Sequence, residues 1–459
     1  MLRDAYDLSF YEFDDEKDPS EYGVLLCDTV HGSPPMKPMY ISIGWYWSYH
    51  GLRHGAGSLC LPMTHGWDSR FIDGYPYITA IPTAPEERKV REPLFKEKIK
   101  PFLENFEGVW DLMKADLLET YEEAKRKRGL VEWEDIRKLT NHELLSFFLD
   151  FACAINRKEA ETHFLMLLAA FEVNNLFQDM WRSTFGAEPG SDPRFNCLTS
   201  GFESAETTFS RGLWKLGRKA VDAGLQDTFA TTEDSELLDA LGTSGPGRKW
   251  LEAYRRYLLD HGWRADRTHT YDCPTWLEKP ALGIARIKLL MSEPVFLFDA
   301  DRDRIEGKKE QVEREVMEKV PVPDKKRFIS LMKAARKASY FKEDQAYYCE
   351  LYIVALGRWI ITEFGRRFAE AGCIDDPGDV HYLQPNEIRK AAIPMGMINL
   401  RPYVEPRKRL YEQYLQKEPV PFYGNVGLAQ EMIRSDPTGI LALCLIPGSA
   451  SPARTTAGV

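Results

Sequence analysis

The chain has 459 residues, of which 44% are hydrophobic and 28% are charged, and its formal net charge is −10. This length is enough for two or three domains, and the acidic balance argues against nucleic acid or an anionic membrane surface as the main partner. The apolar runs are shorter than the roughly 18 residues that a membrane-spanning helix needs. The eight cysteines include no CxxC pair, which is typical of a reduced, cytoplasmic protein and not of a disulfide scaffold or a metal site.

The first 85 residues are the least helical part of the chain and combine turn-forming with aromatic residues. A turn-rich segment at 28–38 is followed by aromatic stretches at 40–50 and 62–76. The residues of interest in these segments are His31, Lys37, Trp45, Trp47, His65, Trp67, Asp68 and Arg70. Two interpretations are open. One is an aromatic core under a few short strands, and the other is an aromatic pocket in which a few polar groups orient a small ligand.

From residue 86 onward the apolar residues recur at helical spacing, which predicts a large helical domain over 86–420. Thr140 and Glu143 match the capping-box pattern at the start of a long apolar helix or helix pair. His163 lies among apolar residues of that helix, so we expect a core histidine. Residues 299–319 are charge-dense and predict a solvated projecting arm. The predicted fold class is mainly α, with a small aromatic-rich α/β segment at residues 1–85.

The segment 260–280 differs from the helical sequence around it. A helix ends at His261 and Gly262, because glycine can take the left-handed conformation that stops helices. The loop that follows is dense in ionisable and aromatic residues, among them Arg264 and Trp276. Such loops on a rigid helical support often carry binding and catalytic residues. The alternative is a solvated interhelical loop in which Trp276 packs on the surface.

The same segment carries a family resemblance. Its pattern HGWR-x-D followed by P-x-W-x-E-x-P resembles the central signature of phosphoenolpyruvate-utilising enzymes, and the segments 206–216 and 364–383 resemble two further motifs of that family in the same order. The N-terminal motifs HGSPP, W-x-W and GWD-x-RF-x-DG are most similar to the phenylphosphate synthase large subunit. Residues 446–459 resemble the start of the family's phosphohistidine domain. We therefore expect 421–459 to be a linker to a phosphohistidine domain that the sequence does not include.

The resemblance implies an ATP-dependent phosphotransferase. A phosphohistidine charged from ATP would phosphorylate a small hydroxylated aromatic compound such as phenol, with aryl phosphate, AMP and phosphate as products. ATP and Mg²⁺ would be bound by an ATP-grasp subunit or partner domain, and this chain would bind no cofactor itself. The sequence contains no GxxxxGK[ST], HExxH or GxSxG motif, so we expect the chain alone to be inactive.

This chemistry assigns roles to individual residues. A phenol needs a general base near its hydroxyl at neutral pH, and the transferring phosphoryl group needs cations. His261 and His65 are the candidate bases, and Arg264 and Arg70 are the candidate phosphoryl clamps. The expected substrate-binding residues are Trp45, Trp47, Trp67, Asp68, His31, Lys37 and Trp276. Two alternative functions are open: a rifampin phosphotransferase-like enzyme with a larger hydroxylated acceptor, and a non-catalytic ligand-binding subunit.

Overall fold

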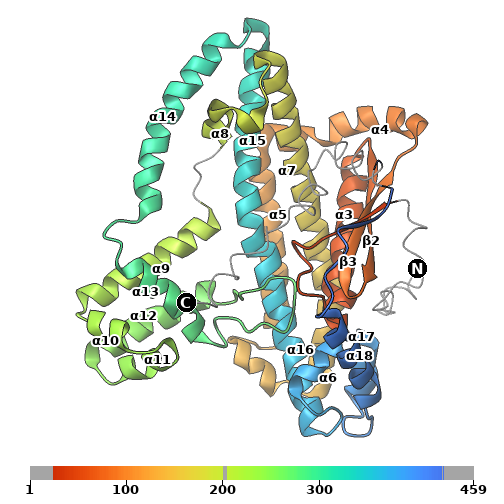
Figure 1. The fold of residues 1–459 in the computed structure, drawn as a ribbon, viewed down its shortest axis with the longest axis vertical. Coiled ribbons are helices and arrows are strands. Elements are labelled where there is room, and N and C mark those ends of the chain that lie inside the picture. Colours follow the sequence, from red (N-terminus) through yellow and green to blue (C-terminus); the bar gives the residue numbers. More distant parts are fainter. Residues whose placement is uncertain (1–23, 200–203, 426, 428–459) are drawn as a thin grey trace. The chain divides into compact units, whose positions relative to one another are not determined.

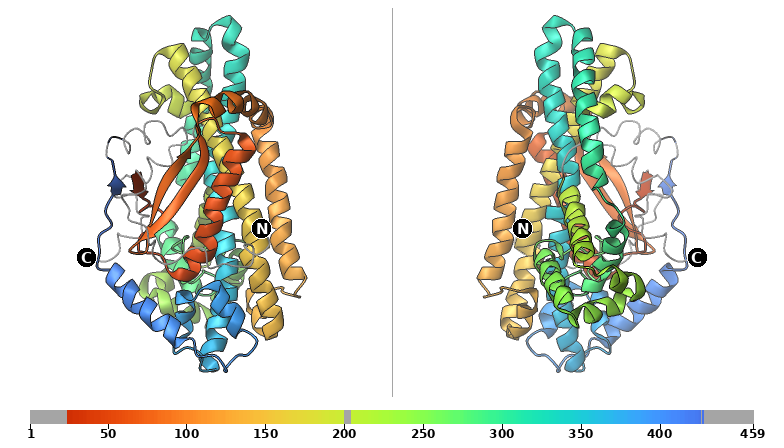
Figure 2. Two further views of the ribbon diagram at one scale, coloured as in Figure 1. Left: turned by 90° about the vertical axis from the view of Figure 1, so that its right-hand side faces the viewer. Right: turned by 90° about the vertical axis from the view of Figure 1, so that its left-hand side faces the viewer.

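A computed structural model describes residues 24–199, 204–425 and 427, without the side chains of 300–305 and 343 (Figures 1 and 2). The chain folds as two compact units. Unit 1 contains the residues up to Asn175, the segment Arg267–Asp272, and the residues from Leu356 onward. Unit 2 contains Leu176–Asp266 and Cys273–Ala355. Helices predominate in both units, which confirms the prediction of a mainly α protein.

Unit 1 contains an antiparallel sheet of four strands in the order β2-β3-β1-β4. The strands are β1 (Val24–Cys27), β2 (Thr64–Ile72), β3 (Tyr75–Pro82) and β4 (Phe422–Gly424). β2 and β3 form a hairpin whose two turn residues, Asp73 and Gly74, have positive φ values of 52° and 72°. An Asp-Gly pair suits such a turn because both residue types tolerate this conformation. β4 pairs with β1, so the sheet joins the beginning and the end of the described chain.

Residues 38–59 are helical, although the sequence places them in its least helical part. They form α2 (Pro38–Tyr40), η2 (Ile41–Trp45) and α3 (Tyr46–Leu59). α3 lies along β2 (Figure 2) and packs closely on the helix that contains Ala160 and Phe164. A Cβ atom on Gly51 would lie 2.4 Å from the carbonyl oxygen of Ala160, and one on Gly55 would lie 2.9 Å from that of Phe164. The two glycines therefore permit close helix packing, which outweighs their low helix propensity.

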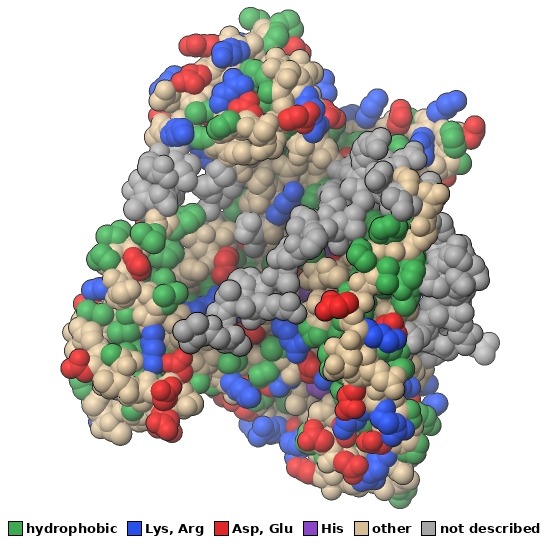
Figure 3. All heavy atoms as spheres, viewed as in Figure 1, with side chains coloured by type: hydrophobic (Ala, Val, Ile, Leu, Met, Phe, Trp, Pro, Cys, Tyr) green, Lys and Arg blue, Asp and Glu red, His purple; other side chains and the backbone are tan. Residues whose placement is uncertain are grey.

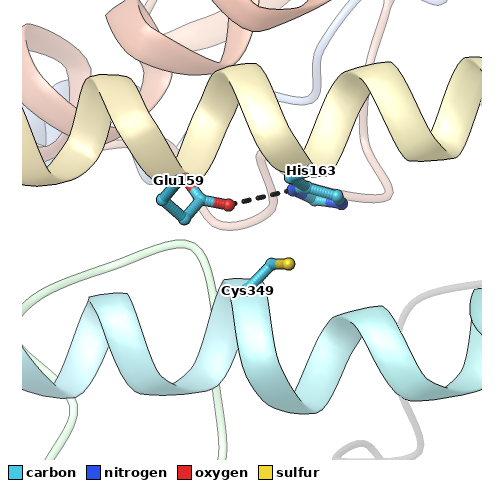
Figure 4. Close-up of side chains that lie close together, drawn as sticks. All are labelled: Glu159, His163 and Cys349. Atoms are coloured by element: carbon cyan, nitrogen blue, oxygen red, sulfur yellow. Dashed lines mark hydrogen bonds and ion pairs between the residues drawn. The ribbon is translucent and has the colours of Figure 1, made fainter. Parts of the chain in front are cut away.

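The remaining helices of unit 1 follow the predicted pattern. They are α4 (Pro85–Lys98), α5 (Lys100–Arg126), η3 (Trp133–Lys138), α6 (Asn141–Asp150), η4 (Phe151–Ile155), the first part of α7 (Asn156–Phe185), most of α16 (Tyr352–Glu370), η9 (Pro377–Tyr382), α17 (Pro385–Ala391) and α18 (Arg401–Tyr414). The capping box of Thr140 and Glu143 is confirmed at the start of α6. His163 is a core histidine, 5% exposed, and its Nδ1 lies 3.1 Å from Oε1 of Glu159 one turn earlier on α7 (Figure 4).

The regular elements of unit 2 are helices. Its elements include η5 (Pro189–Ser191), α8 (Pro193–Thr199), α9 (Ala205–Asp222), α10 (Gln226–Thr231), α11 (Asp234–Gly242), α12 (Gly245–His261), η6 (Pro280–Gly283), α13 (Ile284–Met291), α14 (Leu297–Lys319), η7 (Val322–Asp324), α15 (Lys325–Gln345) and η8 (Ala346–Leu351). Helices α9 to α13 enclose a hydrophobic core that includes Trp250 and Trp276. Among the described residues, every helix is too short or too polar to cross a bilayer.

The charged segment 299–319 lies in α14, which is followed by the turn η7 and by α15 running in the opposite direction (Figure 1). Side chains of both charge signs are interspersed at the upper end of this pair in Figure 3. Val312 and Val316 are nevertheless only 7% and 0% exposed. The predicted projecting arm is therefore a helix with one buried apolar side, and its charged residues cover the solvent side.

Candidate functional site

The stretches 262–266 and 273–277, which belong to unit 2, pair with each other as a small hairpin. The backbone N–H of Trp276 donates to the carbonyl of Arg264 at 2.9 Å, and that of Leu277 donates to Gly262 at 2.8 Å. Ala265 and Thr275 form an antiparallel bridge between them. These bonds hold the backbone of residues 262–266 in a fixed position relative to the core of the unit.

Gly262 does not take the left-handed conformation that the sequence suggested; that prediction was wrong. Its φ is −85° and its ψ is 0°. A Cβ atom at this position would lie 2.6 Å from the carbonyl oxygen of Leu258 and 2.9 Å from the side chain of Leu277. Glycine is needed here for space, because the returning strand of the hairpin passes close to the end of α12.

Trp276 belongs to the core of unit 2. It is 2% exposed, and its ring lies 5.4 Å from that of Phe209 on α9. The adjacent Thr275 is held by Glu278, whose carboxylate accepts from the Thr275 backbone N–H and hydroxyl at 2.8 and 2.9 Å. Trp276 therefore packs beneath the hairpin as part of the core, so the alternative of a surface position is wrong, while its predicted substrate-binding role stays a prediction.

Arg264 is fixed by two neighbours on α9. Its guanidinium lies 3.6 Å from the centre of the Phe209 ring, and its Nη2 lies 2.8 Å from Oε2 of Glu206. The Arg264 side chain is 11% exposed and that of Glu206 is 46% exposed. The Nε atom of Arg264 is buried and has no hydrogen-bond partner among the described residues. A planar cation in this setting offers directed N–H donors at a fixed place.

His261, the last residue of α12, has a defined tautomer. Its Nδ1 lies 2.6 Å from the Tyr347 hydroxyl, which in turn donates to the carbonyl oxygen of Asp260 at 2.8 Å. A carbonyl oxygen only accepts, so the single hydroxyl proton goes to Asp260 and Nδ1–H of His261 donates to Tyr347. In the neutral imidazole the lone pair is then on Nε2.

The surroundings of His261 keep it neutral. Burial lowers the pKa of His261; Asp260 opposes this effect, and the positive charge of Arg264 adds to it. At neutral pH the ring therefore has an unprotonated Nε2, as a general base requires. Burial also raises the pKa of Tyr347, so its hydroxyl keeps its proton.

The polar candidates on the β2–β3 hairpin of unit 1 contact other protein groups. Nε2 of His65 lies 3.0 Å from Glu87, and its Nδ1 lies 3.3 Å from Nη1 of Arg91. Both ring nitrogens thus have partners, and the geometry connects β2 to α4. Arg70 lies 3.0 Å from Asp68 and donates to the carbonyl of Ser69. The predicted catalytic roles of His65 and Arg70 stay predictions, and these contacts favour a structural role for both.

The N-terminal tryptophans lie in the core of unit 1. Trp45, Trp47 and Trp67 are 4%, 8% and 1% exposed. The indole N–H of Trp45 donates to Ser69 Oγ at 2.8 Å, and that of Trp47 donates to the carbonyl of Ala152. The burial of these three side chains favours an aromatic core over an open aromatic pocket.

His31 and Lys37 lie in a second polar cluster, which is also in unit 1. His31 contacts Asp28 at 2.7 Å, and Lys37 contacts Asp272 at 2.8 Å. The structure therefore groups the sequence candidates as His261 with Arg264 in one unit and His31 with Lys37 in the other. Sequence reasoning missed the role of Tyr347, which is 86 positions from His261 and has no local pattern around it.

Comparisons with known proteins match the part of the chain that contains His261 and Arg264. Residues 163–343 match the family model of the rifampicin phosphotransferase fourth domain. Over 256 residues, 55% of the chain, the sequence is 22% identical to the uncharacterized phosphotransferase YvkC of Bacillus subtilis (strain 168), and the match covers 30% of that protein. Over 237 residues, 51% of the chain, it is 24% identical to chondramide synthase cmdD of Chondromyces crocatus, covering 6% of it.

The chain thus spans less than a third of the length of each of these relatives. The matches relate it to phosphotransferases of the rifampicin phosphotransferase type, within the phosphoenolpyruvate-utilising enzymes. The matched segment 163–343 includes α12 and the hairpin after it, whereas Tyr347 lies just beyond its end.

Proposed function

We propose that this chain holds the acceptor of a phosphoryl-transfer reaction and that the hairpin after α12 is the reacting part of unit 2. The observation that carries the proposal is the pairing of a base-form imidazole, His261, with an immobilised guanidinium, Arg264, three residues along the chain and inside the family match. The donor is a phosphohistidine on another domain, charged from ATP and Mg²⁺ by a nucleotide-binding partner. The acceptor is a small hydroxylated aromatic compound of the phenol type.

Arg264 acts on the group in transfer. The phosphoryl group spreads negative charge over three oxygens in the transition state, and positioned cations stabilise that charge. Glu206 and Phe209 hold the guanidinium in one orientation, so little reorganisation is needed when the phosphoryl group arrives. The buried Nε–H of Arg264 is a costly group to leave without a partner. A phosphoryl oxygen would supply that partner.

His261 takes the proton of the acceptor. As the acceptor oxygen forms its bond to phosphorus and the phosphorus–nitrogen bond of the phosphohistidine breaks, the hydroxyl proton moves to Nε2 of His261. Nδ1–H stays bonded to Tyr347 throughout, so the imidazolium keeps its orientation. General-base catalysis of this kind contributes about 10²–10⁴-fold to a rate.

The test uses the chain combined with its phosphohistidine domain and nucleotide-binding partner, with phenol as acceptor and aryl phosphate as readout. Arg264→Lys and Arg264→Ala are each expected to lower kcat by about 10²–10³-fold with little change in KM, by analogy with the loss of a single oxyanion-hole donor. Arg286→Lys is the matched control, because Arg286 is an exposed arginine over the ring of Trp276 in the same unit.

Near-normal kcat in both Arg264 variants would remove Arg264 from the mechanism. Phenol binding without any aryl phosphate from the complete system would instead favour the alternative of a non-catalytic binding subunit. Turnover of larger hydroxylated compounds in preference to phenol would favour the rifampin phosphotransferase-like alternative.

A further inference from the structure

Two histidines of α3 face one carboxylate of α7 within unit 1. His50 and His54 are four residues apart, so they lie on the same side of α3. Nε2 of His50 lies 3.0 Å from Oε1 of Glu161, and Nδ1 of His54 lies 3.8 Å from the same oxygen. The two imidazole rings are nearly parallel, with 23° between their planes and 6.4 Å between their centres. The proposed phosphoryl transfer uses none of these three residues.

The packing of α3 on α7 holds the two histidines in place. Gly51 and Gly55 directly follow them in the chain, and these glycines are the positions at which the backbones of the two helices come into close contact. The ring of His50 packs edge-on against that of Trp47, with 5.0 Å between the ring centres, and the Trp47 indole donates to the carbonyl of Ala152. The imidazoles therefore project from a rigid helix pair.

The hydrogen bonds of this cluster show which nitrogen atoms face the carboxylate. Burial raises the pKa of Glu161, but the hydrogen bonds from His50 and Arg157 and the positive charges nearby outweigh this effect and lower it, so the carboxylate is ionised. It only accepts, and Nε2 of His50 therefore donates to it. The 3.8 Å contact of His54 is too long for a hydrogen bond. Its Nε2 lies 3.3 Å from the Ser58 hydroxyl, and when Nε2–H donates there, the lone pair on Nδ1 points to the side of Glu161.

The Glu161 carboxylate has a second oxygen available. Within the described part of the chain, its contacts to His50, His54 and Arg157 all fall on Oε1, with Nε of Arg157 at 2.8 Å. The side chains of His50, His54 and Glu161 are 36%, 37% and 21% exposed, so an ion can reach them from solvent. The Arg157 side chain is 59% exposed, and its charge is the one that opposes a bound cation at this carboxylate.

We propose that His50, His54 and Glu161 bind a Zn²⁺ ion that joins α3 to α7. The ligands are Nε2 of His50, Nδ1 of His54 and Oε2 of Glu161, with water in the fourth position. Zn²⁺ takes imidazole and carboxylate ligands in this number, and two histidines four residues apart on one helix face are a recurrent half of such sites. Two imidazoles select against Mg²⁺ and Ca²⁺, which prefer oxygen ligands.

Binding requires small rotations of the two histidine side chains and one proton shift. The proton on Nε2 of His50 passes through solvent to Nδ1 of the same ring, and the hydrogen bond to Glu161 is replaced by bonds to the metal. Nε2–H of His54 stays on Ser58, as the second nitrogen of a metal-bound histidine usually does. The ion is additional to the ATP and Mg²⁺ that we expect on a partner, and this inference does not depend on the proposed phosphoryl transfer.

The alternative is a purely structural role, in which the hydrogen bond from His50 to Glu161 ties α3 to α7 without a metal. This role needs neither His54 nor Ser58. A metal site needs both histidines, and it is weakened by the charge of Arg157. The two roles are therefore distinguished by metal affinity across a set of variants.

The affinity of the full chain for Zn²⁺ is measured in competition with a chromophoric chelator. His50→Gln, His54→Gln and Glu161→Gln are each expected to weaken binding by about 10²-fold. Ser58→Ala is expected to weaken it by about tenfold, because partners of metal-bound histidines contribute about 10–100-fold to affinity. Arg157→Gln is expected to tighten binding by about fivefold, because it removes a partly screened positive charge close to the ion.

His65→Gln is the matched control. His65 also lies 3.0 Å from a glutamate, Glu87, and its other ring nitrogen contacts Arg91, so the same residue types meet there with only one histidine. This variant is expected to bind Zn²⁺ as the natural protein does. Thermal unfolding without metal checks that each variant is folded, as expected for partly exposed side chains.

Two measurements on the natural protein identify the ligand atoms even if a variant fails to fold. The chain has eight cysteines that can also bind Zn²⁺, so Co²⁺ serves as a second probe. Its visible spectrum should lack the charge-transfer band of a thiolate ligand. Nitrogen NMR should show Zn²⁺ shifting Nε2 of His50 and Nδ1 of His54.

Several outcomes would overturn the inference. It is wrong if Zn²⁺ does not bind, if a thiolate band accompanies Co²⁺ binding, or if the resonances of His50 and His54 do not shift. It is also wrong if His54→Gln leaves the affinity unchanged, or if His65→Gln lowers it as much as His50→Gln does, because binding would then be a general property of exposed histidines.

Discussion

The buried His381 makes the stability of unit 1 depend on pH. Burial lowers the pKa of His381 from an ordinary 6.5 to about 3; Asp272 opposes this, and Lys37 and Arg358 add to it. Between these two pH values the unfolded chain binds one proton more than the folded chain, so the free energy of unfolding falls as the pH falls. Each pH unit inside this window is worth about 1.4 kcal/mol. From pH 7 to pH 5 the expected loss is therefore about 2 kcal/mol.

The assay compares urea unfolding of the natural protein and His381→Leu at pH 7, 6 and 5. Leucine fills a similar volume and does not titrate. The free energy of unfolding of His381→Leu should therefore fall by about 2 kcal/mol less than that of the natural protein between pH 7 and pH 5. Asp28 and Asp272 have pKa values below the ordinary range. Their contribution to the free energy of unfolding is therefore lost only at a lower pH, and it is lost in both proteins. Parallel pH profiles for the two proteins would refute the assignment of a neutral, buried His381.

Three further predictions concern unit 2 and the chain as a whole. Tyr347→Phe removes the hydroxyl that accepts a hydrogen bond from Nδ1–H of His261, a bond worth about 1 kcal/mol. Nitrogen NMR should therefore show the His261 tautomer ratio shifting about fivefold toward Nε2–H, and an unchanged ratio would contradict the hydrogen-bond assignment. Gly262→Ala should lower the free energy of unfolding by about 1–3 kcal/mol because the added Cβ would crowd Leu258. Gly242 has open space around it, so Gly242→Ala should leave stability unchanged, and thermal unfolding of both variants tests this difference. The purified chain without partner domains should release neither AMP nor ADP from ATP in the presence of phenol and Mg²⁺, and sustained release would overturn the assignment of nucleotide chemistry to a partner.

The local features of the fold were accessible from the sequence. Helical spacing, the Thr140 capping box and the core position of His163 depend on neighbours within a few residues, and all three are confirmed. Residues 38–59 show the limit of this reasoning. Their glycines and aromatic residues disfavour an isolated helix, and their helix becomes favourable only because Gly51 and Gly55 let it pack against α7.

The candidate site could be predicted only in part. The sequence indicated His261 and Arg264 by residue type and family pattern, but their chemistry depends on Glu206 and Tyr347, which lie 58 and 86 positions away. For the tryptophans, residue type alone does not distinguish a pocket position from a core position. Trp67 and Trp276 looked like walls for a ligand because aromatic residues serve in pockets and cores alike, and only their burial at 1% and 2% distinguishes the two.

The pairing of β1 with β4 has a consequence for the order of folding. Val24–Cys27 is the earliest described strand and Phe422–Gly424 the latest, so one edge of the sheet stays open until nearly the whole of this sequence has left the ribosome. Unit 2, by contrast, is almost contiguous in the chain and can close its core long before that point. Until β4 arrives, the apolar strand Val-Leu-Leu-Cys has an uncovered edge, which is the kind of surface that pairs with a second copy and starts aggregation. Removing residues 422–424 would make that exposure permanent.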